Sequence, residues 1–327
     1  MERRSFIGRT LAGGALLGGA LGMGAPPAQA SQSNHMIFTD DLVIERDQPG
    51  HPHEGKVLAA IQPHADDIPI FAAGTVAKLI REGYMGYIIN TTNDDHAGPG
   101  TVGDTVVANE GDVFEVAKAL GLKKVFWLGY RNHQMEDIDF IEMKARLIFL
   151  FRALKVDTII TYDPYGLYEE NPDHWMTARV VEAACWMAGG GKDYPEHFKA
   201  GLAPHGVSEK YYHARGTQLV NRVVDITSVI DKKIESNMAN TAQGPAGNAG
   251  ARLRERLTKE GKRLPGLGDD DRAANFQYVK QFLLEDEKAL GKRFGIEYAE
   301  AFHYIGPGAS YMPTMQEYID KNAVPLR

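Results

Sequence analysis

Apolar runs and amphipathic segments alternate along the first half of the chain. Patterns of buried strands occur near residues 56–61, 85–92, 123–129 and 157–162, and helical patterns occur near 69–83, 104–120, 138–154 and 174–188. A strand followed by a helix, repeated four times, predicts a parallel sheet with helices on both faces. The expected fold class is therefore α/β, with a Rossmann-like, mostly parallel sheet.

The third helical segment shows the periodicity of an amphipathic helix. One side is expected to face the core and carries Ile141, Ala145, Ile148 and Phe151, widened by Leu147 and Leu154. Apolar residues at these intervals predict a helix packed on the sheet.

Regular alternation ends near residue 188. An extended segment is expected over 210–219, leading to Val224-Asp225, and a helix is expected over about 227–243. Glycines then interrupt the pattern at 244–250, and the charged stretch to residue 271 is expected to be exposed, as either a lid or a surface insertion. Neither repeats nor a second autonomous domain are apparent, which predicts one domain over 31–327 with its core at 56–188 and a C-terminal extension at 189–327.

The first thirty residues have the features of an export signal. Arg3-Arg4 precedes a glycine- and alanine-rich apolar stretch, and Ala28-Gln29-Ala30 provides small residues for cleavage. The paired arginines predict a twin-arginine signal. The apolar stretch is too short and too rich in glycine for a stable membrane anchor, so the mature protein is expected to be periplasmic or secreted.

Charge and cysteine content narrow the range of partners. The formal net charge is -7, and removal of residues 1–30, with one acidic and three basic residues, leaves -9. An acidic chain without a Lys/Arg block is a poor partner for nucleic acid or an anionic membrane. The single cysteine, Cys185, excludes an intramolecular disulfide. A small-molecule substrate fits these features best.

A histidine and two aspartates follow the first strand. The sequence Pro63-His64-Ala65-Asp66-Asp67 lies between the strand and a helix expected to begin at Pro69. Open α/β sheets bind ligands at this edge. His64 and Asp67 could turn toward one point and bind zinc, leaving Asp66 free. In the alternative reading, an aspartate caps the helix and His64 is an ordinary loop residue.

A second polar loop, residues 163–174, follows the fourth strand and ends at His174, where the next helix is expected to start. His174 could complete the ligand set. Two histidines and one carboxylate also match the facial triad of iron oxygenases, so Fe2+ stays an alternative to zinc. The absence of Gly-x-Gly-x-x-Gly after the first strand argues against a nicotinamide cofactor.

These two motifs, with the intervening helix and strand, resemble the PIG-L/LmbE superfamily of zinc-dependent N-deacetylases over about residues 56–185. The resemblance implies His64, Asp67 and His174 as zinc ligands and Asp66 as the general base. The chain also departs from the family pattern: Asn171 stands where a histidine is common, and Asn109 or a neighbour stands where an arginine is common.

The remaining candidates belong to the substrate side. Tyr168 is the expected donor to the developing oxyanion, or else a surface tyrosine. Asp173 is expected to orient an imidazole, to cap a helix, or both. Residues expected to line the substrate pocket are Asn93, Asp94, His133 and Asn171, although solvated loop positions are the alternative for the first three.

The resemblance implies removal of an N-acyl group, usually acetyl, from an amino sugar or related small amine. The alternative is a metal-dependent hydratase of an unsaturated acid, as in relatives such as oxalomesaconate hydratase, which would need cationic groups to hold a carboxylate. A non-catalytic protein with a structural metal is a further alternative. Retention of Asp66 argues against it, because a structural site does not need a free base.

Overall fold

The described residues of the computed structural model, 36–307 and 311–325, contain one eight-stranded sheet in the order β1-β7-β8-β6-β5-β2-β3-β4. The strands are β1 (Met36–Glu45), β2 (Val57–Gln62), β3 (Met85–Thr92), β4 (Val125–Tyr130), β5 (Thr158–Tyr162), β6 (Glu209–His213), β7 (Gln218–Asp225) and β8 (Ala299–Ile305). Only β8 among them runs antiparallel to its neighbours, β6 and β7. The predicted α/β class with a mostly parallel sheet is confirmed.

The apolar sequence of β2 follows from burial on both of its faces. Leu58 and Ala60 pack in one core cluster, whereas Ala59 and Ile61 pack in the other. A strand covered on both sides reads as a continuous apolar run instead of an alternating one. This explains why β2 could be recognised without a period of two.

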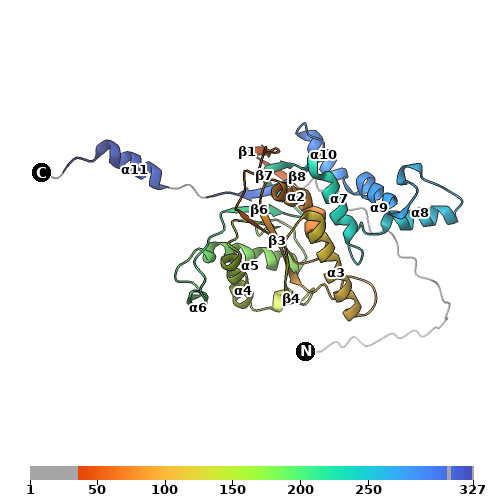
Figure 1. The fold of residues 1–327 in the computed structure, drawn as a ribbon, viewed down its shortest axis with the longest axis horizontal. Coiled ribbons are helices and arrows are strands. Elements are labelled where there is room, and N and C mark those ends of the chain that lie inside the picture. Colours follow the sequence, from red (N-terminus) through yellow and green to blue (C-terminus); the bar gives the residue numbers. More distant parts are fainter. Residues whose placement is uncertain (1–35, 308–310, 326–327) are drawn as a thin grey trace, which may run out of the picture. The chain divides into compact units, whose positions relative to one another are not determined.

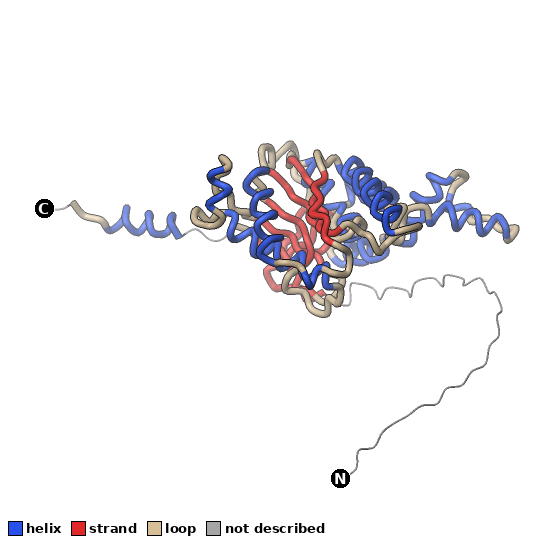
Figure 2. Tube along the Cα trace, turned by 90° about the horizontal axis from the view of Figure 1, so that it is seen from below, coloured by secondary structure: helices blue, strands red, loops and turns tan. Residues whose placement is uncertain are grey.

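Helices cover the two faces, as Figures 1 and 2 show. One face carries α2 (Ala73–Arg81), α3 (Val102–Leu120) and α7 (Ile230–Ala239), and the other carries α4 (Phe140–Leu154) and α5 (Pro172–Ala188). The buried residues of α4 are Met143, Leu147, Ile148, Phe151 and Arg152. The prediction for Ile141 is wrong, because that side chain is 64% exposed in the first turn of the helix.

The first predicted helix differs from the structure in its start and continuity. It begins at Asp67 instead of Pro69, and it breaks at Ala72 into α1 (Asp67–Phe71) and α2. Pro69 is tolerated because the first turn of a helix needs no backbone donor. The helix expected over 227–243 consists of a 3-10 turn (Thr227–Val229) followed by α7, which ends at Ala239.

The C-terminal extension supplies β6, β7 and β8 to the same sheet. It also contains α6 (Pro195–Lys199), α8 (Ala249–Lys259), α9 (Asp271–Tyr278), α10 (Glu285–Arg293) and α11 (Tyr311–Asn322). The 244–271 stretch therefore contains a helix, α8, and a 3-10 turn at Pro265–Leu267. In the part of the chain that the structure describes, no helix is long and apolar enough to span a bilayer. The predicted export signal lies outside the described residues.

The direction of the strand order reverses at β2. From β2 the chain proceeds outward through β3 and β4 and then returns to β5 on the opposite side of β2. Such a reversal separates the loops at the carboxyl ends of the two strands, which is where open α/β sheets bind ligands. His64 follows β2, and the loop to His174 follows β5.

Candidate metal centre

Three potential ligands meet where the segments after β2 and β5 approach each other. His64 Nδ1 lies 3.1 Å from His174 Nε2. Asp67 Oδ2 is 3.4 Å from His64 Nδ1, and Asp67 Oδ1 is 3.6 Å from His174 Nε2. All three side chains are buried, and their ligand atoms lie within 4.8 Å of one another. The two sequence motifs therefore meet at a single point.

Two further carboxylates determine which imidazole nitrogens carry protons. His64 Nε2 donates to Asp173 Oδ2 at 3.0 Å. His174 Nδ1 lies 3.1 Å from Glu169 Oε1, an ion-pair contact that falls short of hydrogen-bond alignment. The hydrogen-bond network implies that these two outer nitrogens carry the protons. The lone pairs of the inner nitrogens, His64 Nδ1 and His174 Nε2, then face each other beside the Asp67 carboxylate. A divalent cation such as zinc fits this donor set.

Electrostatics also favour a positive charge at this point. Burial alone would lower the pKa of His64, but its contacts with Asp173 and Asp67 raise it. Burial alone would raise the pKa of Asp67, but the two imidazoles and Tyr162 hold it well below its usual range. The cluster therefore keeps Asp67 ionised and attracts a cation, either a proton or a metal ion.

Tyr162 fixes Asp67 and His174 together. Its hydroxyl donates to Asp67 Oδ1 at 2.7 Å, and its ring stacks on His174 with centroids 4.0 Å apart. The backbone N–H of His64 donates to the other oxygen, Asp67 Oδ2, at 2.8 Å. Tyr162 is the last residue of a fully buried strand. Sequence reasoning assigned it to the core, and its position at the strand end was the only available signal.

Glu169 is a second residue that the sequence did not single out. Arg215 donates to both of its carboxylate oxygens, at 2.6 and 3.3 Å. Although burial alone would raise the pKa of Glu169, its contacts with His174 and Arg215 lower it to about 2. Glu169 is thus ionised and held against His174 Nδ1.

Asp173 orients His64 and accepts three hydrogen bonds. It accepts from the backbone N–H groups of His133 at 2.7 Å and Met135 at 3.3 Å, in addition to His64 Nε2. His64, His133 and Asp173 also have ligand atoms close together. The group that contains Asp67 is the better metal site, because all three of its side chains are buried whereas His133 is exposed.

Asn171, not Asp173, caps helix α5. Its Oδ1 accepts from the backbone N–H of Asp173 at 3.0 Å, and Pro172 occupies the first helical position. This is an established N-terminal arrangement in helices. The helix therefore starts two residues before His174 and carries the imidazole on its first turn.

Asp66 is the carboxylate left over. It precedes α1 but makes no side-chain cap to that helix, and it is half-buried beside the ligands. Burial and the neighbouring charge of Asp67 raise the pKa of Asp66 to about 7. A carboxylate with this raised proton affinity is suited to accept a proton from water.

The predicted substrate residues occupy different environments. Asp94 is fully buried and accepts from the backbone of Ala65 at 3.2 Å and from Gln243 at 2.9 Å, which is a structural position. Half-buried Asn93 accepts from the backbone N–H of Asp95 at 3.3 Å. His133 is exposed, with its ring centroid 6.3 Å from that of His64. His133 thus lies at the rim of the metal centre.

Tyr168 and Asn109 were also singled out from the sequence. Tyr168 is 86% exposed and has a positive φ of 62°, so its side chain lies in solvent and is not packed against the imidazoles. Asn109 is buried on α3 and donates to the backbone carbonyl of Ala97 at 2.8 Å. Asn109 is therefore a structural amide at the position where the family pattern commonly has an arginine.

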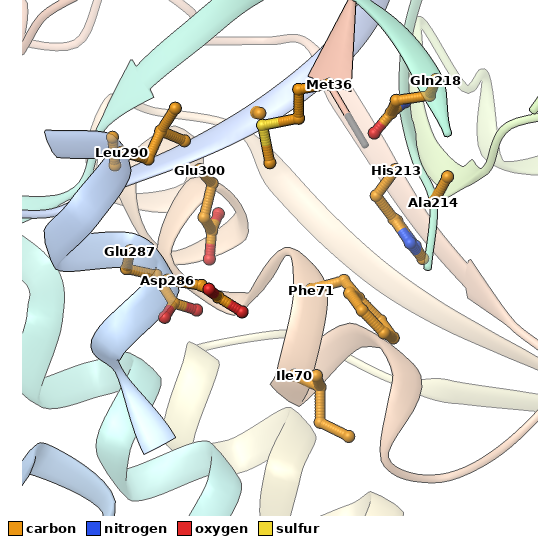
Figure 3. A pocket seen from close by; sticks show the side chains of 12 residues that line it. Met36, Ile70, Phe71, His213, Ala214, Gln218, Asp286, Glu287, Leu290 and Glu300 are labelled. Atoms are coloured by element: carbon orange, nitrogen blue, oxygen red, sulfur yellow. The ribbon is translucent and has the colours of Figure 1, made fainter. Parts of the chain in front are cut away.

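A small cavity lies beside α1, separate from these ligands (Figure 3). It is lined by Met36, Phe71, His213, Asp286, Glu287 and Glu300, among others. Its volume is about 30 Å³, which is room for about two water molecules. None of the three potential metal ligands lines it, so it is not the space in which the metal centre would meet a substrate.

Comparison with known proteins identifies a shared domain. Residues 59–185 match the family model described as PIG-L, GlcNAc-PI de-N-acetylase. Diacetylchitobiose deacetylase of Thermococcus kodakarensis is 25% identical over 193 residues, covering 58% of this chain and 71% of that protein. Mycothiol S-conjugate amidase of Streptomyces coelicolor is 26% identical over 164 residues, covering 42% of this chain and 55% of that protein.

Solved structures share the fold. N,N'-diacetylchitobiose deacetylase from Pyrococcus horikoshii has a TM-score of 0.61 and 22% identity, covering 77% of this chain and 84% of that chain. A 4-carboxy-2-hydroxymuconate hydratase from Pseudomonas putida has a TM-score of 0.55 and 16% identity, covering 78% and 98%. Because a deacetylase and a hydratase share the architecture, the fold alone does not select the reaction.

Proposed function

We propose that this chain, whose residues 59–185 match the PIG-L family model, is an exported zinc-dependent amide hydrolase that removes the N-acetyl group from an amino sugar or related small amine. The observation that carries the proposal is the convergence of His64, Asp67 and His174 with Asp66 beside them. The ligands alone would suit a structural metal, but the free carboxylate supplies a base.

The chemistry follows from the charge states of these side chains. A divalent metal bound by His64, Asp67 and His174 would polarise the amide carbonyl and lower the pKa of a coordinated water toward about 7. Asp66 would accept the proton of the attacking water and return it to the departing amine. Its raised proton affinity suits both transfers, since the same carboxyl must gain and then lose the proton.

Other residues hold this arrangement. Asp173 and Glu169 keep the protons of the two imidazoles on the outer nitrogens, and Tyr162 fixes Asp67. Tyr168 stays the predicted donor to the developing oxyanion. Because its side chain lies in solvent, this role requires it to turn inward when substrate binds.

The choice of an amino sugar rests on relatives. Two diacetylchitobiose deacetylases, one similar in sequence and one in fold, are named for an N-acetylated sugar. The export signal predicted for residues 1–30 would bring the enzyme to extracytoplasmic substrates. Replacing Arg3 and Arg4 with lysine should retain the protein in the cytoplasm, as measured by cell fractionation.

An acetate-release assay tests the proposal. Purified residues 31–327 should release acetate from at least one member of a panel of N-acetylated mono- and disaccharides, and a chelator should abolish the reaction until zinc is restored. The variant Asp66→Asn should bind zinc but lose turnover by about 100-fold or more. Hydration of an unsaturated carboxylic acid without any acetate release would instead favour the hydratase.

A further inference from the structure

The 240–247 loop, between α7 and α8, contacts the residue assigned as the base. It is clamped at its beginning by Asp112 of α3, whose carboxylate accepts from the backbone N–H groups of Thr241 at 2.6 Å and Ala242 at 2.7 Å and from the Thr241 hydroxyl at 3.0 Å. These bonds hold the loop against α3.

The next residue ties the loop to the metal-binding motif. Gln243 Nε2 donates to Asp94 Oδ1 and to Asn109 Oδ1, both at 2.9 Å. The other oxygen of Asp94 accepts from the backbone N–H of Ala65, between His64 and Asp66. A continuous hydrogen-bonded path thus joins the loop to the residue that precedes the base.

Gly244 then lies directly against Asp66. A Cβ atom at this position would be 3.1 Å from Asp66 Cβ and 3.2 Å from Asp66 Oδ2, both shorter than ordinary van der Waals contacts. The backbone of Gly244 also has a positive φ of 83°, which favours glycine. The position therefore admits no side chain without displacing either the loop or the carboxylate.

We propose that Gly244, presented by the clamped 240–247 loop, is a positioning residue that sets the orientation of the Asp66 carboxylate for proton transfer. The inference rests on the proposed function, because it assumes that Asp66 is the base. The sequence left residues 244–271 as either a lid or a surface insertion. The proposal gives Gly244, within that segment, a fixed position beside the Asp66 carboxylate.

The variant Gly244→Ala tests this role. Displacement of the base should lower kcat by about 10- to 100-fold, because misplacing a catalytic group by about 1 Å has an effect of this size. KM and zinc content should stay within about twofold of wild type. The matched control is Gly261→Ala, which has a similar positive φ of 68° but no atom within 4 Å of the added Cβ. It should retain full kcat.

Two more variants separate positioning from general damage. Asp112→Ala loosens the clamp without adding an atom near Asp66, and it should also lower kcat with zinc retained, even if Gly244→Ala does not fold. In the Asp66→Asn background, Gly244→Ala should cause less than a twofold further loss, because two changes that act through one group are not additive.

The outcomes distinguish failure of this inference from failure of the proposed function. Full activity of Asp66→Asn would show that Asp66 is not the base, and it would overturn both that assignment and the role of Gly244. An inactive Asp66→Asn together with wild-type kcat in Gly244→Ala and Asp112→Ala would overturn the inference alone. An equal fold-loss from Gly244→Ala in both backgrounds would also overturn it, because the glycine would then act independently of Asp66.

Discussion

Single protons and hydrogen bonds determine what the metal centre can bind. The inner nitrogens of His64 and His174 are available only while Asp173 and Glu169 hold the protons on the outer ones. Asp173 is buried among backbone donors, whereas Glu169 depends on a loop and on Arg215. Glu169 is therefore the more informative residue for testing how the ligands are oriented.

Replacement of Glu169 by glutamine should lower zinc affinity by about 10- to 100-fold, which is typical for loss of a carboxylate behind a ligating histidine. Competition with a coloured chelator would measure it. The adjacent Glu170→Gln is the control, because that side chain is 89% exposed. Equal zinc affinity in both variants would contradict the orienting role of Glu169.

The pH dependence of kcat/KM should report Asp66. A general base works when ionised, so activity is lost as the pH falls through its pKa. Burial and Asp67 raise the pKa of Asp66 from 3.8 to about 7, and a bound cation would lower it again. The acid limb should therefore have its midpoint between about pH 4 and 7. Activity that increases as the pH falls through this range would contradict the assignment.

The three potential ligands could be predicted from the sequence because each lies next to a strand or helix boundary with a clear signal. Tyr162 and Glu169 could not. Tyr162 belongs to a strand buried along its whole length, so no alternation separates a polar role from a packing role. Glu169 is one of several acidic residues in a loop, and only the folded loop brings it against His174.

At the scale of elements, the site depends on how α5 begins. Asn171 caps the helix and Pro172 starts it, so His174 lies on the first turn with a fixed direction. The departure from the family pattern at Asn171 is thus compatible with a structural purpose. Its predicted contact with substrate is a separate property that can be measured independently.

Asn171→Ala should lower the free energy of unfolding by about 1 kcal/mol, the usual effect of removing an N-cap. Asn171→Asp should keep most of that stability, because aspartate caps equally well. Chemical denaturation would measure both variants. Unchanged stability in the alanine variant together with a large rise in KM would show that Asn171 serves the substrate and not the helix.

The parallel strands β2 to β5, which carry the site, could be predicted from the sequence. The edge strand β1 could not. Strands β2 to β5 have continuous apolar runs followed by polar loops. In contrast, β1 mixes half-buried and exposed residues along its length, which leaves no clear period. The interruption of the helix at Ala72 could not be predicted either. The sequence of residues 69–83 shows one continuous helical pattern, whereas the structure has two helices, α1 and α2.

For the whole molecule, the metal centre joins segments that are distant in sequence. His64 and His174 are 110 residues apart in the sequence, and the 240–247 loop approaches from the C-terminal extension. An unfolded chain cannot hold all three ligands at one point, so metal binding and folding are thermodynamically linked.

Zinc should therefore stabilise the folded protein. At a free zinc concentration of about 100 times Kd, the stabilisation is about 2.7 kcal/mol, and removal of zinc by a chelator should lower Tm by several degrees. His174→Ala should show a Tm that responds much less to zinc or chelator. An equal response in wild type and His174→Ala would mean that zinc binds elsewhere.

The central claim is that one metal ion is held by His64, Asp67 and His174. Anomalous diffraction at the zinc edge, from crystals of enzyme shown to be active, tests it most directly. The account predicts a peak about 2.0–2.2 Å from His64 Nδ1, His174 Nε2 and a carboxylate oxygen of Asp67. A zinc peak at a different set of residues, with none between these three, would contradict it.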